Sequence, residues 1–108
     1  MDYQVIIISQ NDYQLSEELN YTTLDHCILE DENSLIYDDQ KYYFDYLITD
    51  DDSLISNLKL EKEHNIIITN YYQETSALNV FAIGKLIKTN RTIEEQLEII
   101  TNYIINGE

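Results

Sequence analysis

The stretch FDYLITDDD, residues 44–52, places carboxylates on both sides of an apolar run: Asp45 precedes it, and Asp50, Asp51 and Asp52 follow it. A carboxylate at the end of a buried strand can act as a nucleophile that accepts a phosphoryl group, or as an oxygen ligand for a divalent cation. It can equally end a strand or cap the next helix, with no chemical role. The spacing alone leaves both interpretations of Asp50 open.

Other chemistry-bearing residues are few. The single Cys27 excludes an internal disulfide, and with His26 and His64 as the only histidines there is no group of ligands at zinc spacing. Cys27 lies in an apolar run and is interpreted as a small core residue, and the two histidines as surface or strand-edge residues. No nucleophile–base pair and no cofactor motif is present, so the sequence predicts a protein that is not an enzyme, with no metal and no cofactor.

The charge is strongly negative and uneven. The 108 residues carry a formal charge of −15, and residues 1–40 contain ten Asp or Glu without any Lys or Arg. Such a chain repels phosphate backbones, so we expect no direct nucleic-acid binding. The charge is compatible with a solvated surface, with an acidic face for a basic partner, or with a nucleic-acid decoy.

The length predicts one domain, residues 1–108. The aliphatic runs are too short to span a membrane, and the N-terminal residues MDYQ lack the positive region of a signal peptide. We therefore expect no membrane association and a cytoplasmic location.

Five short apolar runs are predicted to be strands: 3–9, 26–30, 44–49, 65–69 and 85–88. Runs that are apolar on both faces and separated by about a dozen residues or more favour parallel strands covered by helices. The predicted fold class is therefore α/β, with a five-stranded parallel sheet and helices on both faces. In such folds the functional groups lie at the carboxyl ends of the strands.

Four segments are candidates for the covering helices. Asp12 could cap a first helix that has Leu15 and Leu19 on one face, and residues 33–42 and 53–63 are partly helical in composition. The clearest helix starts at Thr92, where Thr92 and Glu95 form a T-x-x-E capping box before an apolar stripe. This helix is predicted to pack on the sheet and to end near residues 106–107.

Nearly the whole chain resembles the receiver (CheY-like) domain of bacterial response regulators. The segment DYLITD, 45–50, is similar to the family's acceptor strand, IIIT, 66–69, to its fourth strand, and FAIGKLIKT, 81–89, to the segment that bears its lysine. The resemblance implies the strand order 2-1-3-4-5. It also implies that Asp50 is the phosphoacceptor-like residue, with Thr69 and Lys88 as the supporting hydroxyl and cation.

Two features depart from the receiver pattern. The positions of the family's metal-binding acidic pair are neutral here, Ser9 and Gln10, with Asn11 next, and the position of its aromatic switch residue is Lys85. Magnesium prefers hard, charged oxygen ligands, so the resemblance implies an atypical, or pseudo-, receiver without a bound metal.

The leading functional hypothesis is accordingly a phosphorylation-independent, receiver-like signalling domain in two-component signal transduction. It would act through protein contact, with a homodimer expected, and could be the regulatory domain of a transcriptional response regulator. A second hypothesis is a small acidic inhibitor or immunity-type protein that binds a basic partner. A third is an active phosphoacceptor receiver that uses Asp50.

Overall fold

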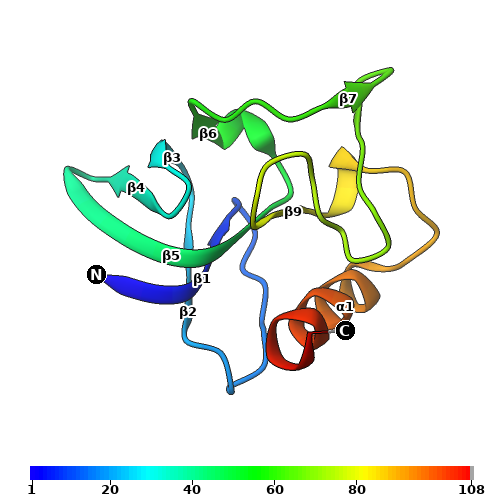
Figure 1. Ribbon diagram of the computed structural model, residues 1–108, viewed down its shortest axis with the longest axis horizontal. Helices are drawn as coiled ribbons and strands as arrows, with labels where there is room; N and C mark the ends of the chain where they lie inside the picture. The colour runs from blue at the N-terminus through cyan, green and yellow to red at the C-terminus, as the bar shows by residue number, and fades with distance from the viewer. Residues whose placement is uncertain (108) are drawn as a thin grey trace.

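The computed structural model describes residues 1–107, and in this range it consists mainly of short strands with one α-helix (Figure 1). The elements, in chain order, are β1 (Asp2–Ile8), β2 (Tyr21–Leu24), β3 (Cys27–Asp31), β4 (Ser34–Tyr37), β5 (Gln40–Thr49), the 3-10 turn η1 (Asp52–Leu54), β6 (Ile55–Ser56), β7 (Lys62–Glu63), β8 (Ile66–Ile67), β9 (Val80–Ala82), the 3-10 turn η2 (Gly84–Leu86) and α1 (Ile93–Asn106).

The main sheet is mixed and curls on itself. Its strand order is β2-β1-β5-β4-β3-β6, with β9 pairing the second half of β5. The neighbours β2, β1, β5 and β9 are parallel, whereas β4 is antiparallel to both β3 and β5. Only two residues separate Leu24 of β2 from Cys27 of β3, so these distant members of the sheet lie within about 11 Å of each other. The sheet must therefore curl, so that the end of β2 comes near the start of β3.

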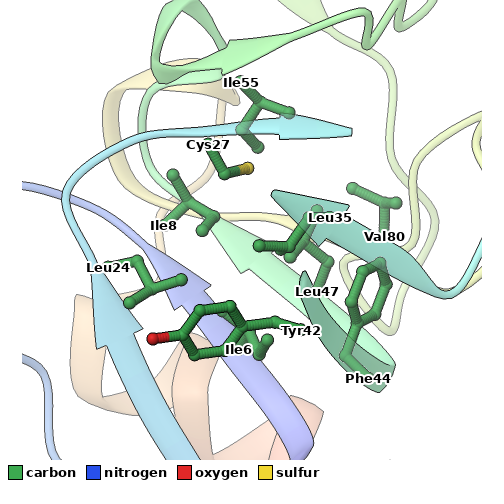
Figure 2. Close-up of a cluster of buried hydrophobic side chains, with 10 residues drawn as sticks. All are labelled: Ile6, Ile8, Leu24, Cys27, Leu35, Tyr42, Phe44, Leu47, Ile55 and Val80. Carbon is green, nitrogen blue, oxygen red and sulfur yellow. The ribbon is translucent and has the colours of Figure 1, made fainter. Parts of the chain in front are cut away.

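The interior of this curl holds the larger part of the apolar core (Figure 2). Ile6 and Ile8 of β1 point inward, which is the alternation expected of a strand whose two faces are both buried. They pack with side chains from β2 to β6 and β9: Leu24, Cys27, Leu35, Tyr42, Phe44, Leu47, Ile55 and Val80. Cys27 is a buried free cysteine whose pKa is raised to about 12 by burial, so it packs as a small apolar residue.

The opposite face of the sheet is covered by α1. Val5 and Ile7, which alternate with the inward residues of β1, contact the cluster that includes Leu97 and Ile100 of the helix. Thr92 caps the helix as predicted, with its side chain accepting from the Glu95 backbone while the Glu95 side chain returns to the Thr92 N–H. The helix ends at Gly107, where φ is +77°, a left-handed geometry that suits glycine.

Tight two-residue turns join the antiparallel strands. Asp38 and Asp39 connect β4 to β5 with φ of 53° and 62°, and His64 and Asn65 connect β7 to β8 with φ of 52° and 65°. Positive φ at both central residues is the signature of a type I′ turn, whose twist matches that of the flanking strands. These two turns set the registers of β4 with β5 and of β7 with β8.

The predicted α/β fold with five parallel strands in the order 2-1-3-4-5 and helices on both faces is wrong. Residues 33–42 form the hairpin of β4 and β5, and residues 53–63 contain only η1, two short strands and turns. The segment after Asp12 has no helix, although Leu19 is still buried against the α1 side of the sheet. Residues 85–88, predicted as the fifth strand, belong to η2 and the loop after it.

In residues 1–107, no helix is both long enough and apolar enough to cross a membrane.

Candidate functional site

Asp50 lies at the centre of a polar cluster beyond the carboxyl ends of two parallel strands. Ile8 of β1 is the register partner of Thr49 of β5, so the next residues, Ser9 and Asp50, emerge side by side. The Thr49 hydroxyl donates to the Ile8 carbonyl at 2.8 Å, which ties the two strand ends together. The sheet therefore fixes the position of Asp50 through backbone register.

Three neutral side chains donate to the same oxygen of Asp50. The Oδ2 atom accepts from Ser9 Oγ at 2.9 Å, Asn11 Nδ2 at 3.0 Å and Tyr13 Oη at 2.6 Å. Asp50 itself is only 7% exposed. Burial, followed by the hydrogen bond to Asp50, raises the pKa of the Tyr13 phenol to about 12, so Tyr13 remains a donor at neutral pH.

The other carboxylate oxygen faces an open pocket. In residues 1–107, Oδ1 accepts no side-chain or backbone hydrogen bond, yet no buried side-chain oxygen in this range lacks a partner. Oδ1 therefore contacts solvent, and Asp50 lines a pocket of about 300 Å³. The other lining residues are Gln10, Asn11, Tyr13, Asp51, Leu54, Gly84, Lys85 and Ile93.

Lys85 supplies the cation of this pocket. Its Nζ lies 3.5 Å from Asp51 Oδ2, and its side chain is 74% exposed. The pKa of Asp51 is lowered, first by the hydrogen bond from the Ser53 hydroxyl and more weakly by Lys85. Gly84 has φ of +66°, and a Cβ at this position would lie 3.3 Å from the Ile93 Cδ1 and 3.6 Å from the Asp50 Cβ. The glycine thus lets the chain turn close beside Asp50.

The sequence-predicted site residues fall into two places. Ser9 and Gln10 are next to Asp50, as their position after β1 implied. Thr69 and Lys88 instead line a different pocket, of about 420 Å³, beside the β7–β8 hairpin. Sequence reasoning did not find Tyr13, because no regular periodicity marks the loop in which it lies; its place two residues after Asn11 was the only available signal.

A second candidate pocket, of about 460 Å³, lies at the end of β3. Its apolar wall consists of Leu29, Phe44, Leu58, Ala77, Leu78 and Val80. Its rim carries the three consecutive carboxylates Glu30, Asp31 and Glu32. Hydrogen bonds from the Asn33 backbone and the Ser34 hydroxyl lower the pKa of Asp31, so this carboxylate keeps its charge under mildly acidic conditions.

Neither pocket contains a conventional metal centre. Across the described part of the chain, no three His, Cys, Asp or Glu side chains are grouped so that they could hold a metal ion.

Comparison with known proteins gives little further information. No family model and no curated protein matches the chain. Among solved structures, a ferredoxin-flavin thioredoxin reductase from Clostridium acetobutylicum is similar at 11% identity and a TM-score of 0.38, covering 98% of this chain and 49% of that one. The chain thus spans about half the length of that protein. A likeness this weak supports no conclusion about fold or function.

The topology of the structure shows that the resemblance to response regulator receivers is wrong, and with it the assignment to two-component signal transduction. The antiparallel pairs β3–β4 and β4–β5 replace two helix-covered crossovers of a receiver. A receiver also has a fifth strand, predicted here at 85–88, and a helix before it. Here those residues lie in η2 and a loop, and α1 is the one α-helix in residues 1–107.

Proposed function

We propose that this chain is a small acidic binding protein, of the inhibitor or immunity type, that recognises a basic segment of a partner protein and performs no catalysis. The observation on which this proposal rests is the apolar pocket with an acidic rim at the end of β3. An apolar side chain of the partner would enter the pocket, and flanking Lys or Arg side chains would pair with the rim.

The charge of the chain supports a cationic partner. Of six Lys and Arg residues, Lys41, Lys62 and Lys85 already lie within 4.0 Å of a carboxylate. The net charge of −15 raises the local concentration of a basic partner and accelerates encounter, an effect that salt screens. The same field disfavours nucleic acid.

The rim is available to such a partner. Within residues 1–107, Glu30 pairs only with Lys41, at 3.3 Å, and both side chains are more than 40% exposed. Exposed ion pairs contribute little, so a partner's lysine can replace Lys41 at small cost. Leu78, on the pocket wall, is 65% exposed and would be covered by the partner. Exposed apolar surface inside a charged border is typical of interaction sites.

The test is binding of two synthetic peptides, one with a leucine between two pairs of lysines and one with serine at that central position. We expect the leucine peptide to bind roughly tenfold more tightly or better, because burying a leucine contributes about 2 kcal/mol. The double variant Glu30→Gln/Glu32→Gln should weaken binding about fivefold, given about 0.5 kcal/mol for each exposed pair. Isothermal titration calorimetry at two salt concentrations measures both effects.

The matched control is Glu17→Gln/Glu18→Gln, which removes the same charge from two exposed residues outside this pocket. It should change affinity much less than the rim variant. Equal loss in both double variants would show diffuse attraction without a site. Equal affinity for the leucine and serine peptides would remove the apolar pocket from the proposal.

A further inference from the structure

The pocket at Asp50 is separate from the acidic rim and has a different chemistry. It is lined by a buried carboxylate, a phenol and two side-chain amides, with Leu54 and Ile93 as apolar walls. Three protein donors hold Oδ2 of Asp50 and thereby fix the orientation of the carboxylate. Because its orientation is fixed, the carboxylate is a preorganised acceptor. All three donors are neutral, so its negative charge is left for a cation to pair with.

The unused acceptor capacity points toward the pocket. A carboxylate offers about four lone-pair sites, and the donors of this chain all converge on one oxygen. Asp50 is more than nine-tenths buried, yet its Oδ1 accepts nothing from residues 1–107. Oδ1 faces solvent in the pocket, and a hydrogen bond between a cation and a carboxylate is stronger than one between neutral groups, so a cationic donor that reaches Oδ1 would be bound favourably.

We propose that this pocket binds a small ammonium or guanidinium group, which donates to Oδ1 of Asp50 and lies against Leu54 and Ile93. The amide oxygens of Gln10 and Asn11 are additional acceptors on the pocket lining. Lys85, which pairs with Asp51, places its own positive charge at the pocket and so competes with an incoming cation. The group can belong to a free small amine or to an arginine side chain of another protein, and the two sources share this chemistry.

The test is titration of the full chain with methylguanidinium, followed by NMR of backbone and side-chain amide groups. Saturable shifts are expected at Asn11, Gly84 and Lys85, and tetramethylammonium, which has the charge but no N–H donor, should not produce them. A capped Gly-Arg-Gly tripeptide distinguishes the sources: tighter binding than methylguanidinium indicates an arginine of a partner, and equal or weaker binding indicates a free small molecule. Equal shifts with tetramethylammonium would overturn the proposal.

Asp50→Asn is the decisive variant. Its amide oxygen can replace Oδ2 as acceptor for the three donors, which places the NH₂ group at the pocket, so methylguanidinium affinity should fall about tenfold or more. Asp45→Asn, an exposed residue of β5 outside this pocket, removes the same charge and should leave affinity nearly unchanged. Equal affinity in both variants would overturn the proposal.

A second pair of variants keeps the test independent of how Asp50→Asn folds. Lys85→Met removes the competing cation and should tighten methylguanidinium binding, whereas Lys59→Met changes the same charge at an exposed residue that does not line the pocket. No difference between these two variants would count against the site. None of these substitutions changes Glu30 or Glu32, so a negative result at the Asp50 pocket does not count against the proposed function, which rests on the acidic rim. A negative result with the rim variant likewise does not count against the Asp50 pocket.

Discussion

Asp39 provides a direct test of the hairpin that replaces a predicted helix. It is exposed, is the second central residue of the β4–β5 turn and has φ of 62°. Left-handed backbone geometry costs an L-residue roughly 1–2 kcal/mol, whereas it costs glycine almost nothing. The cost is smaller for aspartate than for alanine. We therefore expect Asp39→Gly to be the most stable protein, the natural protein to be intermediate and Asp39→Ala to be the least stable. The free energies of unfolding of the two variants should differ by roughly 1–2 kcal/mol.

A helix over residues 33–42 would give the opposite order, because alanine is the best helix former and glycine is about 1 kcal/mol worse. Both variants lose the same carboxylate, so the change in net charge cancels in their comparison. Thermal melts followed by circular dichroism should separate the two by roughly 4–8 °C per kcal/mol. Glu98, exposed on α1, is the internal control, since Glu98→Ala should be more stable than Glu98→Gly. If Asp39→Ala is the more stable variant at the turn, the type I′ hairpin is refuted.

Two further predictions concern polar side chains that make internal hydrogen bonds. Gln96→Leu should lower the free energy of unfolding by about 1–3 kcal/mol, because the Gln96 Oε1 atom accepts from the Gly84 N–H at 2.9 Å and from Gln73 Nε2 at 3.2 Å; urea denaturation measures this, and an unchanged midpoint would contradict it. The pKa of Tyr13 is raised from 10.0, its value in the unfolded chain, to about 12 in the folded protein. The stability that the protonated phenol contributes is therefore complete below pH 10.0 and is lost as pH rises to about 12. Tyr13→Phe should therefore reduce the fall in stability across that interval, and parallel pH profiles of the two proteins would show that Tyr13 does not titrate in this way.

The helix was predictable because its signals are local. Thr92 and Glu95 stand three residues apart and satisfy each other's backbone groups without help from the rest of the fold. The burial of β1 was predictable for a similar reason, because a run of four aliphatic residues has no polar face to expose; Val5, Ile6, Ile7 and Ile8 are all fully buried.

The hairpins were not predictable from the same kind of signal. The usual marker of a type I′ turn is Asn-Gly or Asp-Gly, and here the turns are Asp38-Asp39 and His64-Asn65. Without glycine, the composition of residues 33–42 is compatible with a helix, and the sequence then predicts the strands on either side to be separate and parallel. Hydrogen-bond pairing of β4 with its sequence neighbours β3 and β5 overrides the local helix propensity.

A different error, in the position of the last strand, explains which lysine lies beside the candidate site. The expected fifth strand at 85–88 would have brought Lys88 to Asp50. On the side away from β1, the parallel neighbour of β5 is instead β9, in which Ala82 is the register partner of Thr49 and the Ile83 N–H donates to the Thr49 carbonyl at 3.0 Å. The residues that follow this pairing are Gly84 and Lys85, so the chain turns next to Asp50 and delivers Lys85 to the pocket. Because Lys85 then pairs with Asp51 and not with Asp50, Oδ1 of the buried carboxylate retains its capacity to accept a donor from outside the chain.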